Sequence, residues 1–313
     1  MNSLFTWTKN MQADELQQQE MLSWSFESLI GGRSENQDFY GYSQTQDGSR
    51  LFVVCDGMGG MRGGSTASKE AVRVIMEEVS ESMEPDPEKL LVNALQKANA
   101  AVFRLGQSKE ELRGMGTTVV ALLINKDKAT AAHVGDSRIY QLRGKQIVFR
   151  TFDHSVVFEL VKQGRLTEEQ ARLSPDSNLI NRALGMKPEV EIEINGGLSY
   201  LKGDRFMLCT DGISGAIEEQ KLIKAVASKK TVEETVKDLT AEIDTMGRKM
   251  GGDHDNMTIA LIDANINSDL NTSTHPTKEY RLFIIILSVV VLLLIVSVGF
   301  NIYLFFEKIK YLK

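Results

Sequence analysis

The sequence predicts an α+β fold in which antiparallel sheets are covered by helices. Short apolar runs of strand length mostly end at Gly or Asp, as strands bounded by turns do. Amphipathic stretches with helical spacing lie between groups of these runs, and their apolar stripes are typical of helices that pack on a sheet. The strand-like runs cluster and helical stretches follow one another, whereas a doubly wound parallel sheet requires strand and helix to alternate.

The elements follow in chain order from these two periodicities. Strands are predicted at residues 24–30, 51–55, 117–124, 129–134, 139–142, 205–210 and 257–262. Helices are predicted from apolar residues that recur at helical spacing over residues 67–79, 91–102 and 232–246.

Composition divides the chain into further segments. Residues 1–22 form a Gln-rich, acidic extension without a clear apolar face, and residues 23–263 form one domain. Residues 264–280 include a stretch rich in Asn, Ser and Thr, which cannot build a core and predicts a linker.

Residues 281–306 are predicted to form a transmembrane helix. From Leu282 to Phe306 the sequence runs for 25 residues without a charge. As a helix this stretch is about 37 Å long, enough to cross about 30 Å of hydrocarbon. Tyr280 and Tyr303 lie near its ends, where interfacial aromatic residues are common. A buried core helix is the less favoured alternative at this length, and residues 307–313 form a short basic tail.

The predicted arrangement is a single-pass membrane protein with its domain in the cytoplasm. Three lysines follow the span and two basic residues precede it, a count that slightly favours a C-terminus inside. We nevertheless expect the large domain to stay in the cytoplasm, against that count. The N-terminal sequence lacks the apolar core and cleavage site of a signal peptide, which would be needed to export the domain. The lipid bilayer is therefore a predicted partner.

The charge balance argues against nucleic acid as a partner. The chain carries a net charge of −6, and its first 263 residues carry −8 without a Lys/Arg cluster. Binding to a phosphate backbone requires basic patches. The two cysteines, Cys55 and Cys209, each end an apolar run and are predicted to be buried, reduced thiols.

The chemically informative residues are aspartates at the ends of apolar runs, each beside a glycine or a small polar residue. They are Asp38, Asp56, Asp136, Asp211 and Asp255. Mg²⁺ and Mn²⁺ prefer oxygen ligands, which carboxylates at strand ends could supply. A glycine after the aspartate would let the backbone turn sharply and bring a carbonyl within ligand reach. Two such cations clamp a phosphate and lower the pKa of a bridging water.

Each of these motifs alone also fits a turn, because Asp-Gly and Gly-Asp-Ser are common in loops. Five acidic motifs at the ends of apolar runs are harder to explain in this way. The pattern by itself predicts a hydrolase site for divalent metals.

The order of several short motifs resembles the metal-dependent protein phosphatases of type 2C, and most of all their bacterial branch. The resemblance covers about residues 23–263. Its motifs are Gly32-Arg33, Asn36-Gln37-Asp38, Asp56-Gly57-Met58-Gly59-Gly60, Gly116-Thr117-Thr118, Val134-Gly135-Asp136-Ser137-Arg138, Asp153-His154-Ser155, Arg182-Ala183-Leu184-Gly185, Thr210-Asp211-Gly212 and Asp255-Asn256-Met257-Thr258.

The resemblance implies a fold and an activity. The fold would be a four-layer α-β-β-α sandwich of two antiparallel sheets flanked by helices, with metals in a cleft at one end. The activity would be hydrolysis of phosphoserine and phosphothreonine by a water that two Mn²⁺ or Mg²⁺ ions activate. Partners would be phosphorylated proteins, including a serine/threonine protein kinase and its substrates.

The resemblance also implies a role for each site residue. The metal set would be Asp38, Asp56, Gly57, Asp136, Asp211 and Asp255. Asp56 would bridge two ions, the Gly57 carbonyl would bind one, and Asp211 and Asp255 would complete the pair. Asp38 would support the metal waters, and Asp136 with Asp211 would hold a third, weaker ion. Arg33, Asp56 and Asp211 would form the catalytic group.

Arg33 would also bind the substrate phosphate, since a planar guanidinium can donate two parallel hydrogen bonds. Residues 156–178 resemble the flap of bacterial members and by themselves predict two short surface helices. Met58 departs from many animal members, which place a histidine there to protonate the leaving oxygen. A metal-bound water, His133 or His154 could take that role, although a structural role is favoured for both histidines.

Two other functions stay open at this stage. A phosphoprotein-binding pseudophosphatase would be expected to lack some of Asp56, Asp211 and Asp255, all of which are present. A phosphatase for small phosphate esters shares the chemistry, and a substrate panel would separate it from a protein phosphatase.

Overall fold

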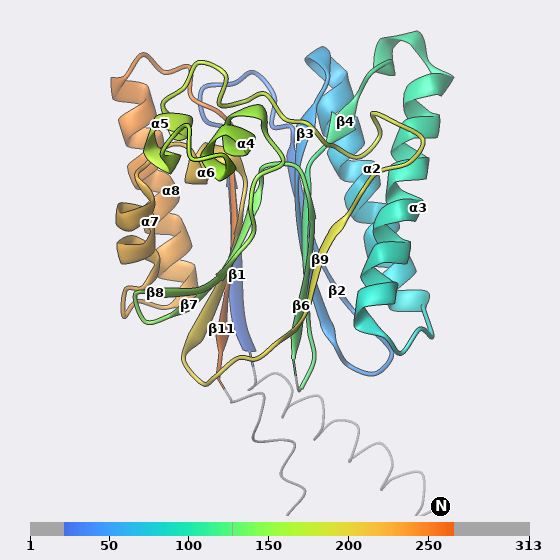
Figure 1. The fold of residues 1–313 in the computed structure, drawn as a ribbon, viewed down its shortest axis with the longest axis horizontal. Helices are drawn as coiled ribbons and strands as arrows, with labels where there is room; N and C mark the ends of the chain where they lie inside the picture. The colour runs from blue at the N-terminus through green and yellow to red at the C-terminus, as the bar shows by residue number, and fades with distance from the viewer. Residues whose placement is uncertain (1–21, 127, 266–313) are drawn as a thin grey trace, which may run out of the picture. The chain divides into compact units, whose positions relative to one another are not determined.

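The structure is a computed structural model that describes residues 22–126 and 128–265. Two antiparallel β-sheets lie face to face, and helices cover the outer face of each (Figure 1). The predicted four-layer α-β-β-α sandwich is therefore confirmed for this part of the chain.

The first sheet has five strands in the order β1-β11-β10-β7-β8. Their bounds are Leu22–Leu29 for β1, Met257–Ala264 for β11, Asp204–Cys209 for β10, Arg138–Arg143 for β7 and Gln146–Arg150 for β8. Its outer face is covered by α7 (Glu219–Val226) and α8 (Val232–Lys249). Three short helices lie near one end of this sheet: α4 (Val156–Lys162), α5 (Glu168–Arg172) and α6 (Asp211–Ser214).

The second sheet has six strands, five of them in the order β2-β3-β5-β6-β9, while the short β4 pairs with β3. Their bounds are Asp38–Gln44 for β2, Arg50–Met58 for β3, Gly116–Thr117 for β4, Val119–Ile124 for β5, Ala129–Val134 for β6 and Glu193–Leu198 for β9. Two long helices, α2 (Gly60–Glu81) and α3 (Pro87–Ser108), cover its outer face, and a short 3₁₀ helix, η1 (Glu110–Leu112), follows them.

Three apolar clusters hold the layers together. The central one lies between the sheets and includes Phe52, Leu122, Phe206 and Ile262. The other two lie under α2 and α3 and under α7 and α8. Each large aliphatic or aromatic side chain buried in this way contributes about 1.5–3 kcal/mol to folding. Both cysteines are free and fully buried, as predicted.

Helix α8 shows how local sequence fixes an element that borders the site. Thr231 and Glu234 form a reciprocal capping box at its start. Acidic residues lie in its first turn and Arg248 and Lys249 in its last, which complements the helix dipole. Its buried face includes Val236, in line with the predicted stripe.

Sequence patterns missed β2, β8 and β9 and merged two other strands. The first three residues of β8 are exposed and the last two are partly buried, and β9 contains two glycines, so neither strand shows a clean apolar run. Strand β2 shows only a weak alternation of buried and exposed residues, because only its first residue is buried. The predicted strand at residues 117–124 is broken at Thr118, whose backbone N–H donates to the Asp56 carbonyl.

The predicted transmembrane helix at residues 281–306 lies outside the described residues, as do residues 1–21, the tail and nearly all of the linker. Among the helices formed by residues 22–126 and 128–265, none combines the length and apolar character needed to cross a bilayer.

Candidate active site

The five aspartates singled out in the sequence come together at one end of the sandwich. Asp38 opens β2, Asp56 lies in β3, Asp136 follows β6, Asp211 opens α6 and Asp255 precedes β11. Four of them, all except Asp38, line one cavity of about 510 Å³ together with Gly57 and Arg33. Both sheets therefore contribute carboxylates to one site.

The backbone of Asp56 is held on both sides by hydrogen bonds. Its N–H donates to Thr118 Oγ1 at 3.0 Å, and its carbonyl accepts from the Thr118 N–H and from Thr117 Oγ1, each at 2.8 Å. Thr118 Oγ1 lies 2.7 Å from Ser137 Oγ, next to Asp136. The Gly116-Thr117-Thr118 motif thus fixes the position of Asp56 relative to Asp136.

Gly57 has a different role from the one expected of it. It does not form a sharp turn but continues β3, and its N–H donates to the Gln37 carbonyl at 3.1 Å. A Cβ at this position would lie 2.1 Å from the carbonyl oxygen of Gly64 in α2. The glycine is required because helix and strand approach closely, and the turn comes at Gly59, whose φ is 121°.

Burial and mutual repulsion raise the pKa values of these carboxyls. Burial is the main cause of the rise in the pKa of Asp38 to about 7, which hydrogen bonds from Thr258 and Thr210 reduce and Asp211 and Asp255 reinforce. Burial also raises the pKa of Asp56 well above its ordinary value, and repulsion from Asp38 adds to the rise.

Asp136 and Asp211 follow the same rule. Burial raises the pKa of Asp136 well above its ordinary value, with repulsion from Asp211 as the next cause. Burial raises the pKa of Asp211 too, and repulsion from Asp255 adds to it. The fold therefore holds four carboxyls whose ionised forms are only partly compensated by hydrogen bonds and charges of the described residues.

The donor set fits a divalent cation. Asp38 Oδ1 and Asp211 Oδ1 are buried and accept no hydrogen bond from any described residue. A buried carboxylate oxygen normally has a partner, and an ion is one explanation for its lack. The cluster offers only oxygen ligands, which hard cations such as Mg²⁺ and Mn²⁺ prefer.

Arg33 lies at the rim of the cluster, with 45% of its side chain exposed. Its Nη2 donates to Asp255 Oδ2 at 3.0 Å. The loop that carries it packs tightly on the chain before β11, since a Cβ at Gly32 would lie 1.8 Å from the carbonyl oxygen of Gly252. A guanidinium beside the carboxylates is placed to meet a phosphate that binds there.

Asn256 is a site residue that the sequence motif contained but to which we assigned no role. Its Nδ2 donates to the carbonyls of Ile30 and Glu35, and its Oδ1 accepts from the Gln37 N–H at 2.8 Å. One buried amide therefore fixes the loop of Arg33 against the strand that follows Asp255. Its position directly after the predicted metal ligand Asp255 was the feature of the sequence that could have indicated a role at the site.

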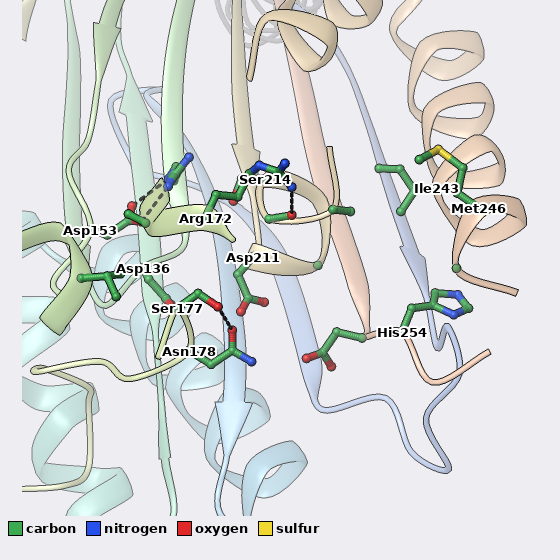
Figure 2. A pocket seen from close by; sticks show the side chains of 18 of the residues that line it. Asp136, Asp153, Arg172, Ser177, Asn178, Asp211, Ser214, Ile243, Met246 and His254 are labelled. Atoms are coloured by element: carbon green, nitrogen blue, oxygen red, sulfur yellow. Dashed lines mark hydrogen bonds and ion pairs between the residues drawn. The ribbon is translucent and has the colours of Figure 1, made fainter. Parts of the chain in front are cut away.

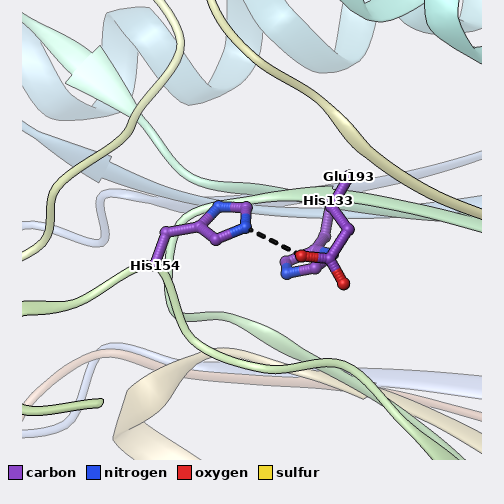
Figure 3. A group of neighbouring side chains, drawn as sticks. All are labelled: His133, His154 and Glu193. Atoms are coloured by element: carbon purple, nitrogen blue, oxygen red, sulfur yellow. Dashed lines mark hydrogen bonds and ion pairs between the residues drawn. The ribbon is translucent and has the colours of Figure 1, made fainter. Parts of the chain in front are cut away.

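His133 and His154 stack on each other with their ring centroids 4.5 Å apart (Figure 3). His133 Nε2 lies 2.9 Å from the Phe152 carbonyl and must donate to it. His154 Nδ1 accepts from the Gly135 N–H, so its Nε2 carries the proton that faces Glu193 Oε2 at 3.3 Å. The pair braces the turn that carries Asp136.

These contacts do not favour a second metal site at the two histidines. With His154 Nδ1 accepting a hydrogen bond, Nε2 could bind a cation only as an imidazolate. Burial lowers the pKa of both rings, that of His154 to about 4. A ring that is neutral at pH 7 is a poor proton donor, and among the described residues that line the two larger cavities neither histidine occurs.

The segment predicted to be the flap forms two short helices, as expected. Thr167 and Gln170 form a capping box at the start of α5. Arg150 of β8 pairs with Glu168 of α5 and with Glu219 of α7. This double ion pair joins the segment to the first sheet.

Comparison with known proteins agrees with this geometry. The protein phosphatase 2C family profile matches residues 27–246. Serine/threonine phosphatase stp of Listeria innocua is 32% identical over 238 residues, which are 75% of this chain and 92% of that protein. Protein phosphatase PhpP of Streptococcus pneumoniae is 34% identical over 236 residues, which are 74% of this chain and 93% of that protein.

Solved structures give the same result. The S. agalactiae serine/threonine phosphatase aligns with a TM-score of 0.70 and 33% identity, over 78% of this chain and 99% of that one. The catalytic domain of PstP in complex with 2 manganese ions aligns with a TM-score of 0.65 and 30% identity, over 78% of this chain and 98% of that one. The chain belongs to the protein phosphatase 2C family of serine/threonine protein phosphatases.

Proposed function

We propose that the domain hydrolyses phosphoserine and phosphothreonine in proteins with two bound Mn²⁺ or Mg²⁺ ions. Asp56, the Gly57 carbonyl, Asp211 and Asp255 would hold the ions, Asp38 would support the pair, and Asp136 with Asp211 would hold a third. The observation that carries this proposal is the cluster of buried carboxyls with raised pKa values and two oxygens that lack a partner in the described chain. When bound, divalent cations lower the pKa of a shared water and offset phosphate charge.

The chain's own residues orient the substrate. Arg33 binds the phosphate oxygens through two parallel hydrogen bonds, and Asp255, its present partner at 3.0 Å, holds the guanidinium at the rim until then. Asn256 keeps the loop of Arg33 in place. The ionised carboxylates repel an anion, so their charge would have to be offset before a phosphate binds beside Arg33.

The leaving oxygen of serine or threonine requires a proton that Met58 cannot donate. His133 is tied to the Phe152 carbonyl and His154 to Glu193. We infer that water in the cavity supplies this proton.

Activity of the purified full-length chain on phosphopeptides tests the proposal. Phosphate should be released from phosphoserine and phosphothreonine peptides with Mn²⁺ or Mg²⁺, and release should stop with chelator. Asp211→Asn should lose turnover, while Asp238→Asn, an exposed aspartate of α8, should retain it. Release that continues in chelator contradicts the metal mechanism. Tight binding of phosphopeptides without turnover would identify the pseudophosphatase instead.

We further propose that residues 281–306 anchor the enzyme in a membrane, with the domain of residues 23–263 on the cytoplasmic side. The support is the uncharged run of 25 residues and the linker of residues 264–280 before it. Alkaline carbonate should leave the full chain in the membrane fraction and release a chain that ends at residue 280. A kinase at the same membrane is a proposed partner, tested by whether the anchored enzyme dephosphorylates it.

A further inference from the structure

A second cavity opens from the carboxylate cluster. We call it the α8 groove: a space of about 430 Å³ between the end of α8 and the helices α4 and α5. Figure 2 shows Ile243 and Met246 of α8 on one side, Arg172 of α5 toward the other, and Asp211 between them. Arg33, Asp136, Asp211 and Asp255 line both cavities, so the groove is continuous with the site where we place the phosphate.

Apolar side chains line part of each wall of the α8 groove, beside polar residues such as Glu168 and Asn178. Helix α8 contributes Ile243 and Met246, and Met250 follows at its end with 82% of its surface exposed. The opposite wall contributes Val157 and Phe158 of α4 and Ala171 of α5. Exposed methionine beside a cavity adapts its shape to different apolar partners.

The floor between these walls is made of small residues. Gly212, Ser214, Gly215 and Ala216 line it. Arg172 Nη1 donates to the Gly215 carbonyl at 3.1 Å, which joins α5 to the floor. Without large side chains, the floor leaves room for the backbone of an extended peptide.

The charged residues that line the α8 groove are mostly acidic: there are three arginines, Arg33, Arg138 and Arg172, and six acids, Asp136, Asp153, Glu168, Asp211, Asp253 and Asp255. Arg138 makes two bonds of 2.7 Å to Asp153, and Arg172 pairs with Glu169. Asp253 is exposed at the α8 end and forms no ion pair with any described residue. An acidic substrate side chain would thus meet repulsion there, because the described arginines of the groove, Arg33, Arg138 and Arg172, already pair with acidic residues.

We propose that the α8 groove binds the residues next to the phosphorylated serine or threonine and selects substrates with an apolar side chain close to the phosphate. The proposal rests on the proposed function, because the phosphate must sit at the carboxylate cluster. An extended peptide advances about 3.3 Å per residue, so the neighbouring residues follow directly into the groove. An apolar neighbour is preferred over a polar one, and an acidic one is disfavoured.

Peptides with one phosphothreonine in a Ser/Gly background test the preference. Leucine, glutamine or glutamate is placed in turn at each neighbouring position, and kcat/KM is measured with the full-length enzyme and Mn²⁺. At one or two positions leucine should raise kcat/KM about 10-fold over glutamine, mainly through KM, and glutamate should lower it further. Equal rates for leucine and glutamine at every position overturn the proposal.

Variants then assign the preference to the α8 groove. Met246→Gln with Met250→Gln keeps helix-compatible side chains and should abolish most of the leucine advantage, leaving p-nitrophenyl phosphate turnover unchanged. The matched control is Met83→Gln, at a methionine that is 80% exposed between α2 and α3. If the double variant keeps the full preference for leucine, the α8 groove does not cause that preference. The same conclusion follows if the variant loses as much activity on p-nitrophenyl phosphate as on the leucine peptide.

A second variant guards against misfolding. Met250→Lys changes a highly exposed side chain and should relieve the discrimination against glutamate; an unchanged discrimination contradicts the role of this wall. Failure of the proposed function gives a separate result. In that case the wild-type enzyme cleaves p-nitrophenyl phosphate but no phosphopeptide of the series, whereas cleavage of all peptides without preference refutes the groove alone.

Discussion

Asp38 and Asp56 face each other directly across the antiparallel register of β2 and β3. Thr210 Oγ1 donates to Asp38 Oδ2 at 2.9 Å, while Asp38 Oδ1 has no hydrogen-bond partner among the described residues. Two carboxylates in adjacent, partly buried positions repel each other. The fold tolerates this arrangement at a cost in stability, as binding sites commonly do.

Asp38→Asn should therefore stabilise the metal-free protein at pH 8. The amide removes a buried carboxyl whose pKa is about 7 and which must ionise at that pH. We expect a gain of about 2 kcal/mol in the free energy of unfolding in chelator. Urea denaturation measures it, and titration with Mn²⁺ should show weaker binding by the variant. A variant that is less stable in chelator would contradict the assigned repulsion.

Metal-free stability should fall as the pH rises from 5 to 8. The folded-state pKa of Asp38 is raised above that of the unfolded chain, so the folded state binds more protons in this range. The stability that protonated Asp38 contributes is fully present below the pKa of the unfolded chain, near 4, and is lost as the pH rises through about 7. We expect the melting temperature in chelator to drop by about 5 °C. Saturating Mn²⁺ should reduce or reverse this slope, and an unchanged slope would argue against ions at the carboxyls.

Gly64→Ala should destabilise the protein although alanine is the better helix former. In an exposed helix this substitution gains about 1 kcal/mol. Here the new Cβ would lie 2.6 Å from the Gly57 carbonyl oxygen and 2.7 Å from the Gln37 side chain. We expect a loss of about 2 kcal/mol and weaker Mn²⁺ binding. Gly63→Ala is the control in the same turn, because its closest contact is a Met115 side-chain atom at 3.1 Å.

Asn256→Ala should raise KM for phosphopeptides and also lower stability. It removes three hydrogen bonds to the loop of Arg33 and leaves buried backbone groups without partners, which costs about 2–3 kcal/mol. Arg33→Ala should raise KM in a similar way with little change in the melting temperature, since that side chain is 45% exposed. Equal stability of the two variants would show that Asn256 does not anchor the loop.

Buried strands and their carboxylates were predictable from the sequence. Strands β5, β6 and β10 are buried along nearly their whole length and therefore appear as continuous apolar runs that end near an acidic residue. The helical stripes of α2, α3 and α8 were equally clear. These patterns gave the α+β class and indicated a metal site.

Other features depend on tertiary contacts that no local pattern reports. The pairing of Asp38 with Asp56 follows from the register of β2, an edge strand whose own pattern is weak. Gly57 was expected to turn, because Asp-Gly is a turn signal, and the close approach of Gly64 is visible only in the folded chain. The α8 groove likewise joins residues more than seventy positions apart.

The two buried cysteines have a consequence for the redox behaviour of the enzyme. Cys55 directly precedes Asp56 and Cys209 lies two residues before Asp211, yet both thiols are fully buried. Burial raises the pKa of Cys209 to about 12 and that of Cys55 further still. Peroxide reacts with exposed thiolates. The two thiols, protonated and enclosed, are therefore poor targets for the oxidants that silence enzymes with a cysteine nucleophile.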